Sequence, residues 1–145
     1  MTLEEKIDRL EAIEAIRTLM STYCHGIDKH DADTFMSIWA QDAVYNLPRG
    51  EGVGIDGVRA LVEKVWVQVP QCHHHITNPV INVNGDTAVA KTDVFYFRQT
   101  QDDYFTLLSG GYDFAFVKES GEWKVSLLKF NAFVNTSPIF KENIR

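Results

Sequence analysis

The sequence predicts an α+β fold, a cone-shaped barrel in which three N-terminal helices pack in a curved, mostly antiparallel sheet. Up to Pro70 the apolar residues recur every three or four positions, which is the helical period. After Pro70 they alternate with polar residues, which is the period of a half-buried strand. Helices followed by strands are typical of α+β proteins whose helices cover one face of the sheet.

The size and composition indicate one globular domain over residues 1–145, with 45% hydrophobic and 23% charged residues. The formal net charge is −6 and basic residues do not cluster, so nucleic acid and anionic membranes are not expected as partners. No apolar run reaches the ~20 residues that a membrane helix needs. The N-terminus lacks the layout of a signal peptide. Cys24 and Cys72 are too few for a disulfide framework, so we predict a cytoplasmic protein with reduced thiols.

The first predicted helix covers residues 3 to about 29, and Thr2 with Glu5 fits a capping box at its start. Its buried stripe is predicted from apolar residues at helical spacing: Ile7, Leu10, Ile13, Ile16, Met20, Tyr23 and Ile27. Asp28 lies in the last turn, where the helix dipole disfavours an acid. A local conflict of this kind often marks a functional residue.

A second helix is predicted over residues 32–40, capped by Asp31. Its buried face would contain Phe35, Ile38 and Trp39. Residues 42–47 alternate as a short strand, and the glycines between 50 and 57 predict a loop with a short strand around Val53. Asp56 is predicted to cap a third helix that Pro70 ends. Its apolar residues at helical spacing are Val58, Leu61, Val62, Val65, Trp66 and Val69.

Four long strands are predicted in the second half, over residues 74–83, 87–100, 104–118 and 122–135. Asn84-Gly85 and Ser120-Gly121 are hairpin signals, and Gln101-Asp102-Asp103 is a polar turn. Short links make neighbouring strands antiparallel, so the sheet is predicted to be a meander. Long twisted strands wrapped around a helix form a cone whose interior can hold a ligand.

Asp28 and the run His73-His74-His75 are the residues best suited to chemistry. In a strand His73 and His75 share one face and His74 points to the other, so the run cannot supply three convergent zinc ligands and no metal is predicted. A neutral imidazole ordinarily titrates near pH ~6.5 and can accept a proton. A carboxylate on its other nitrogen fixes the tautomer and favours the imidazolium. The alternatives are a solvated acid at a helix end and an ordinary core or surface histidine.

Residues 15–45, AIRTLMSTYCHGIDKHDADTFMSIWAQDAVY, resemble the signature of SnoaL-like domains in the nuclear transport factor 2-like superfamily. The matching elements are Ala15-Ile16-Arg17, Tyr23, Asp28, Asp31, Trp39 and Asp42-Ala43-Val44. The segments His74–Asn78 and Gly121–Val125 also fit, so the resemblance covers nearly the whole chain. In motif the sequence is most similar to scytalone dehydratase and hexachlorocyclohexane dehydrochlorinase.

This resemblance implies a catalytic pair, Asp28 and His74, that works inside the cone with neither a metal nor an organic cofactor. Further residues expected to contact the substrate are Tyr23, Trp39, Tyr45, Trp66, Cys72 and Asn131. Asp93 and Asp113 could face either the pocket or solvent. The dehydrochlorinases carry an arginine on the last strand, where this chain offers only Lys129 on the opposite face, so halide elimination is not expected.

The leading hypothesis is a cofactor-independent lyase or isomerase acting on a small, largely apolar cyclic substrate. His74 would remove a proton and Asp28 would orient His74, with loss of water or a double-bond shift to follow. The alternatives are a non-catalytic small-molecule binder or structural subunit, and a polyketide-cyclase-like enzyme that uses an acid alone. An open sheet edge and the resemblance both predict a homodimer or homotrimer.

Overall fold

The computed structural model describes residues 1–99, 104–136 and 140–141. The elements follow in the order α1 (Leu3–Asp28), α2 (Ala32–Ser37), β1 (Trp39–Leu47), β2 (Gly50–Val53), α3 (Gly54–Gln68), β3 (Cys72–Asn84), β4 (Thr87–Gln99), β5 (Tyr104–Glu119), β6 (Glu122–Asn135) and β7 (Phe140–Lys141). The helices precede the long strands, as predicted. The predicted turn at Gln101-Asp102-Asp103 lies outside the described residues.

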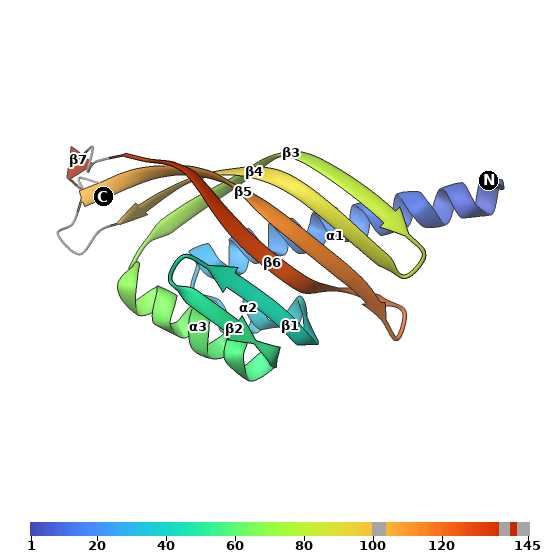
Figure 1. Cartoon of the computed structure of the whole chain (residues 1–145), viewed down its shortest axis with the longest axis horizontal. Coiled ribbons are helices and arrows are strands. Elements are labelled where there is room, and N and C mark those ends of the chain that lie inside the picture. The colour runs from blue at the N-terminus through green and yellow to red at the C-terminus, as the bar shows by residue number, and fades with distance from the viewer. Residues whose placement is uncertain (100–103, 137–139, 142–145) are drawn as a thin grey trace.

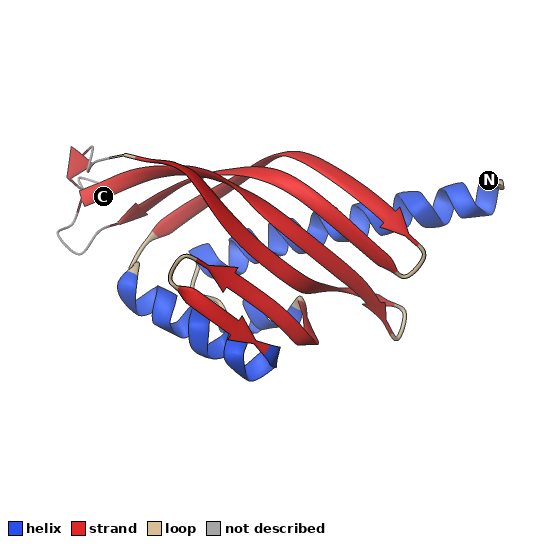
Figure 2. Cartoon of the chain, viewed as in Figure 1, coloured by secondary structure: helices blue, strands red, loops and turns tan. Residues whose placement is uncertain are grey.

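The strands form one curved sheet around the helices (Figures 1 and 2). Its order is β2-β1-β6-β5-β4-β3, with β7 paired to β5. The pair β1 and β6 is parallel and the other pairs are antiparallel, so the sheet is mostly antiparallel as predicted. Among the described strands β2 and β3 are the edges, so the cone is unclosed. That the chain assembles into a homodimer or homotrimer stays a prediction from the sequence.

Helix α1 begins with the predicted capping box, in which the Glu5 N–H donates to the Thr2 hydroxyl at 3.2 Å. Its C-terminal half buries Ile16, Met20, Tyr23 and Ile27. The predicted stripe is wrong at the other end, where Ile7 is 47% and Leu10 is 65% exposed. The reason is visible in Figure 1, where the N-terminal end of α1 extends beyond the sheet.

The predicted second helix is too long at its C-terminal end. Asp31 caps α2 as expected, accepting from the Thr34 N–H at 3.0 Å, but the helix ends at Ser37. Trp39 and Ala40 instead begin β1, because the Val125 N–H of β6 donates to the Ile38 carbonyl at 2.8 Å and draws this segment into the sheet. Asp56 does not cap α3. The capping residue is Val53, and Asp56 lies in the first turn.

The C-terminal end of α1 is held in place from two sides. Trp66 of α3 donates its indole N–H to the Ile27 carbonyl at 3.0 Å, and the His30 ring stacks on Trp66 with centroids 5.3 Å apart. On the other side Gly26 packs against α2, where an added Cβ would lie 2.7 Å from the Phe35 Cα. The position of the last turn of α1 is therefore fixed by close packing.

We expect Gly26→Ala to lower the free energy of unfolding by about 1–3 kcal/mol, because a methyl group at this contact must displace backbone. Urea denaturation measures the change. Glu14→Ala, on the exposed face of α1, is the matched control and should stay within about 0.5 kcal/mol of the wild type. Equal stability of Gly26→Ala and the wild type would contradict the close contact between α1 and α2.

The long strands match the sequence prediction closely, and bulges bend them. In β3 the register shifts between Thr77 and Val80, and Asn78 adopts a positive φ of 52° at this point. The Asn78 amide donates to Asp93 at 3.1 Å on the exposed face of the sheet. The asparagine that follows the histidine run therefore belongs to a bulge, and bulges increase strand bending and twist.

Among the described residues, no helix is long and apolar enough to cross a membrane.

Candidate active site

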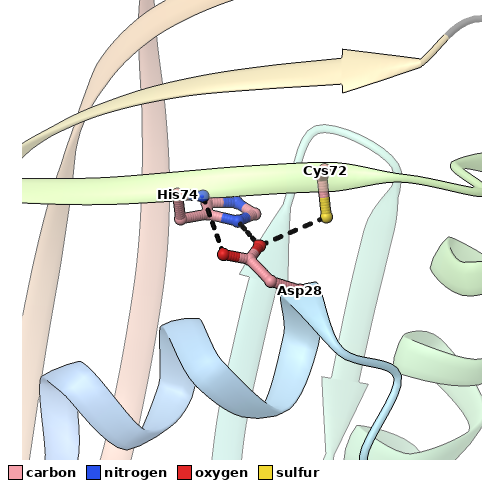
Figure 3. Close-up of side chains that lie close together, drawn as sticks. All are labelled: Asp28, Cys72 and His74. Atoms are coloured by element: carbon pink, nitrogen blue, oxygen red, sulfur yellow. Dashed lines mark hydrogen bonds and ion pairs between the residues drawn. The ribbon is translucent and has the colours of Figure 1, made fainter. Parts of the chain in front are cut away.

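Asp28 at the end of α1 and His74 near the start of β3 meet beneath the sheet (Figure 3). Asp28 Oδ1 lies 2.5 Å from His74 Nδ1, and Asp28 Oδ2 accepts the His74 backbone N–H at 2.8 Å. The two side chains are only 11% and 5% exposed. The alternative of a solvated acid at a helix end is therefore excluded by the geometry.

The hydrogen bond to Asp28 determines which nitrogen of His74 can act as a base. An ionised carboxylate only accepts hydrogen bonds, so Nδ1 must carry the proton. In the neutral imidazole Nε2 then holds the free lone pair. Since His74 lines a cavity, Nε2 is the nitrogen left available to a bound molecule. The pair has the geometry of a general base and its orienting carboxylate.

Asp28 stays ionised although it is largely buried. Burial by itself would raise the pKa of its carboxyl group. The hydrogen bond and charge of the His74 ring, the His74 backbone N–H and the Cys72 thiol outweigh burial and lower the pKa of Asp28 below its ordinary value. The conflict between an acid and the negative end of the helix dipole is thus resolved by partners from β3.

The cavity beside His74 has a volume of about 290 Å³, at the lower end of the size of ligand pockets. Its wall combines residues of α1, β1, α3 and the four long strands. The lining residues are Tyr23, Ile27, Tyr45, Leu47, Pro48, Arg49, Val65, Val69, Cys72, His74, Tyr96, Arg98, Leu108, Tyr112, Phe130, Ala132 and Asn135. An apolar cavity of about 150 Å³ is enough to bind benzene, so this cavity has room for one ring and its substituents.

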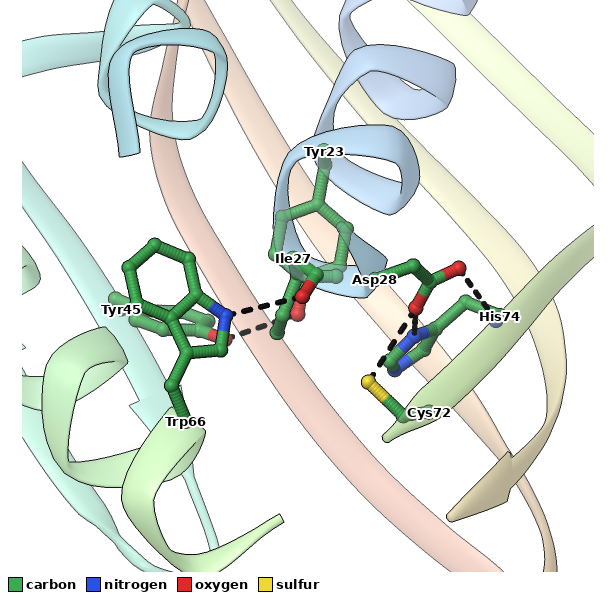
Figure 4. Close-up of polar contacts among 7 residues, drawn as sticks. All are labelled: Tyr23, Ile27, Asp28, Tyr45, Trp66, Cys72 and His74. Carbon is green, nitrogen blue, oxygen red and sulfur yellow. Dashed lines mark hydrogen bonds and ion pairs between the residues drawn. The ribbon is translucent and has the colours of Figure 1, made fainter. Parts of the chain in front are cut away.

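Three tyrosines form the deeply buried part of the cavity wall. The hydroxyls of Tyr23 and Tyr45 lie 3.0 Å apart (Figure 4). The ring centroids of Tyr23 and Tyr112 are 5.6 Å apart, with an angle of 79° between the rings. Tyr23, Tyr45 and Tyr112 are 1%, 0% and 3% exposed. Burial is the main cause that raises the pKa of each phenol, so all three are neutral hydrogen-bond donors. Tyr23 also shares a side-chain hydrogen bond with Tyr112. Three hydroxyls joined by two hydrogen bonds use two of their three hydrogens, which leaves one for a ligand.

A fourth tyrosine and two arginines line the less buried part. The Tyr96 ring stacks on His74 with centroids 4.4 Å apart and an angle of 16°. Burial raises the pKa of Tyr96, and the charges of Arg98 and Arg49 oppose that rise. Both guanidinium groups therefore lie close enough to the Tyr96 phenol to affect it.

The structure places three of the predicted contact residues on the cavity wall, namely Tyr23, Tyr45 and Cys72. His73 and His75 are exposed on the opposite face, as the alternation predicted, with ring centroids 4.3 Å apart. The Cys72 thiol donates to Asp28 at 3.4 Å.

The prediction is wrong for Trp39, Trp66 and Asn131, which do not line the cavity. Trp39 is 3% exposed in the core against Phe35, and the Trp66 indole is held by the Ile27 carbonyl. The amide of Asn131 instead donates to Asp113 at 2.9 Å.

The reversal at Asn131 has a physical cause in the register of β6. The pairing with β5 shifts between Val125 and Leu127, so one extra residue, Ser126, stands in β6. A one-residue bulge moves every later side chain to the other face of the sheet. Leu128 and Phe130 then point inward and are buried.

Asp28, Cys72 and His74 also offer three metal-ligand atoms within 4.8 Å of one another. Those atoms are engaged in hydrogen bonds with each other. Burial and the charge of Asp28 raise the pKa of the Cys72 thiol, so it stays protonated rather than forming the thiolate that metals bind. Burial likewise raises the pKa of Cys24 to about 12. The donor set thus favours an Asp–His pair over a metal site. That the protein works without a metal or an organic cofactor stays a prediction from the sequence.

Sequence reasoning missed Tyr96, Tyr112, Arg98 and Arg49. A signal existed for Tyr96 and Arg98, because they continue the inward-facing alternation of Thr92 and Val94 along β4. An arginine at an inward position of a strand is unusual. Arg49 lies in the turn between β1 and β2, where no periodicity reveals the direction of a side chain.

Residues 8–129 match the model of the SnoaL-like domain family. A type 2 hexachlorocyclohexane dehydrochlorinase (LinA) is a similar solved structure, with 26% identity, a TM-score of 0.88 and 97% of each chain covered. LinA-type3 from Novosphingobium barchaimii LL02 has 28% identity and a TM-score of 0.86, over 92% of this chain and 94% of that chain.

A scytalone dehydratase-like protein from Novosphingobium aromaticivorans DSM 12444 has 20% identity and a TM-score of 0.79, over 94% of this chain and 91% of that chain, which shows a shared fold alone. A comparison with curated protein sequences gave no significant match. These findings confirm the predicted resemblance and the α+β fold of the nuclear transport factor 2-like type.

Proposed function

The chain belongs to the SnoaL-like domain family, and from this premise we propose that it is a cofactor-independent lyase or isomerase in which His74 removes a proton from a small cyclic substrate. The observation that carries the proposal is the buried contact between Asp28 and His74 Nδ1, which leaves Nε2 for the cavity. General-base catalysis by a positioned histidine typically contributes about 10²–10⁴-fold to a rate.

In the proposed reaction His74 Nε2 takes a proton from a carbon next to a carbonyl group. The electrons of the broken C–H bond move into an enolate, whose oxygen accepts the free hydroxyl hydrogen of the group formed by Tyr23, Tyr45 and Tyr112. Asp28 stabilises the imidazolium that forms. If the adjacent carbon carries a hydroxyl group, its C–O bond breaks, the imidazolium returns the proton and water leaves. If the substrate instead carries a carbon–carbon double bond on the next two carbons, the enolate is conjugated with it, the imidazolium returns the proton to the far carbon of that bond and the double bond shifts.

The similar dehydrochlorinase structures suggest elimination as the reaction type, but the leaving group proposed for this chain is a hydroxyl group, which departs as water, rather than a halide. Lys129, the cation nearest in sequence to the position that the resemblance implies, is exposed, while its neighbour Phe130 lines the cavity. A hydroxyl leaving group needs a proton, which the imidazolium can supply, whereas a halide does not.

The proposal is tested by hydrogen exchange at carbon in D₂O. Monocyclic ketones such as cyclohexanone and cyclohexenone serve as probes, and NMR follows deuterium entering the position next to the carbonyl. We expect the wild-type protein to accelerate exchange of at least one probe by about 100-fold or more over buffer. Probes that bind, as shown by calorimetry, but exchange at the buffer rate would contradict catalysis and favour the non-catalytic binder.

A further inference from the structure

Two arginines, Arg49 and Arg98, line the cavity without an acidic partner among the described residues. Arg49 Nη1 donates to the Gln68 side-chain oxygen at 2.6 Å, and Arg98 Nε donates to the Thr106 hydroxyl at 3.4 Å. Both acceptors are neutral. Each guanidinium group has five N–H donors, so most of its donors remain for a ligand.

The two positive charges act on each other. Partial burial is the main cause that lowers the pKa of Arg49, and repulsion from the charge of Arg98 is the second cause. The nearest acid of the site, Asp28, is occupied by His74 and Cys72. With His74 neutral, two guanidinium groups and one carboxylate leave one positive charge uncompensated, in a chain whose net charge is −6. Gathering like charges in a cavity costs stability, and a local cost of this kind often accompanies function.

The sheet register places Arg98 next to the base. His74 pairs with Tyr96 across β3 and β4, and Cys72 pairs with Arg98. Two residues along a strand span about 6.6 Å and return to the same face, so Arg98 lies one inward position beyond Tyr96. The width of a single six-membered ring is similar to this spacing. A ring resting near Tyr96 would thus place one substituent toward the arginines while another part faces His74.

We propose that the substrate is a monocyclic carboxylate, whose carboxylate group is bound by Arg49 and Arg98 while its ring contacts His74 and the tyrosines. Planar guanidinium groups bind carboxylates in a bidentate manner, and one carboxylate supplies the single negative charge that the cavity lacks. This inference rests on the proposed function for the position of the reacting carbon. It refines the expected apolar substrate to an apolar ring that carries one anionic group.

Calorimetry with isosteric probe pairs tests the inference. Benzoate and benzamide differ in charge but hardly in shape, as do cyclohexanecarboxylate and its amide. We expect the wild type to bind each carboxylate at least about tenfold more tightly than its amide, and added salt to reduce this preference. Arg98→Gln and Arg49→Gln should each lose about tenfold in carboxylate affinity while amide affinity hardly changes. Arg98→Lys keeps the charge and should retain part of the preference.

Arg59→Gln is the matched control, since Arg59 is an exposed α3 residue paired with Glu63. It should leave the carboxylate preference unchanged. Equal affinity for benzoate and benzamide in the wild type would overturn the inference, as would an equal loss of affinity in the Arg59→Gln control. Binding of phenyl phosphate or chloride in strong preference to benzoate would overturn the assignment of a carboxylate.

The two proposals fail in different ways. Carboxylate binding that depends on Arg98, without carbon exchange in any bound ring compound, would support the inference and reject the lyase or isomerase. Exchange of a neutral ketone that depends on His74, in a wild-type protein that binds benzoate and benzamide equally, would support the enzyme and reject the carboxylate substrate.

Discussion

His74→Gln is expected to reduce carbon exchange by about 10²–10⁴-fold, the range that a positioned general base supplies. Glutamine has no lone pair of comparable basicity, but its amide can still donate to Asp28 and fill much of the space of the imidazole. The probe should therefore bind with similar affinity while the exchange rate falls. NMR exchange rates and calorimetric dissociation constants, measured on the same preparation, separate the two effects.

The chain provides its own control for this substitution. His75→Gln changes a histidine of the same strand that is exposed on the outer face, so it should leave exchange and binding unchanged. If His74→Gln retained full activity while Asp28→Ala abolished it, the acid would act alone. That result would reject the histidine base and favour the polyketide-cyclase-like alternative.

Much of the fold follows from local patterns in the sequence. The change from helical to alternating periodicity after Pro70 located every long strand within about two residues, because each strand has one buried face. The same alternation correctly separated His74 from His73 and His75. Asp28 was recognised as a candidate functional residue because an acid in the last turn of a helix is disfavoured by the helix dipole.

Other features depend on contacts that no local pattern contains. Asn131 was assigned to the wrong face because the bulge at Ser126 reverses the alternation within β6. Trp39 and Trp66 were expected at the cavity because aromatic side chains suit both a core and a binding wall. Here Trp39 packs on Phe35, and Trp66 holds the end of α1. The meeting of Arg49 and Arg98 needs the turn after β1 to lie across from the end of β4, which only the tertiary fold determines.

The second large effect is expected from Asp28→Asn, which removes the charge of the orienting carboxylate but keeps its shape. If the asparagine oxygen continues to accept the His74 backbone N–H, its NH₂ group faces Nδ1. Nδ1 must then become the acceptor, so the proton moves to Nε2 and the base is lost. We expect carbon exchange to fall by about 10²–10⁴-fold with little change in probe binding. A variant with unchanged exchange would show that Asp28 does not orient the base.

Asp28→Asn should also change the dependence of stability on pH. The pKa of Asp28 is lowered in the folded protein, so its contribution to stability is present above the ordinary carboxyl pKa of about 3.9 and is lost as pH falls through the lowered value. Near neutral pH we expect the variant to lose about 1–3 kcal/mol of unfolding free energy, because a buried charge-assisted hydrogen bond is removed. Between about pH 4 and the acid limit the gap between wild type and variant should shrink. Urea denaturation across this range measures the gap, with Asp42→Asn, at an exposed position of β1, as the control. A gap that stayed constant down to the lowest pH would mean that the ionised carboxylate of Asp28 does not hold α1 to β3.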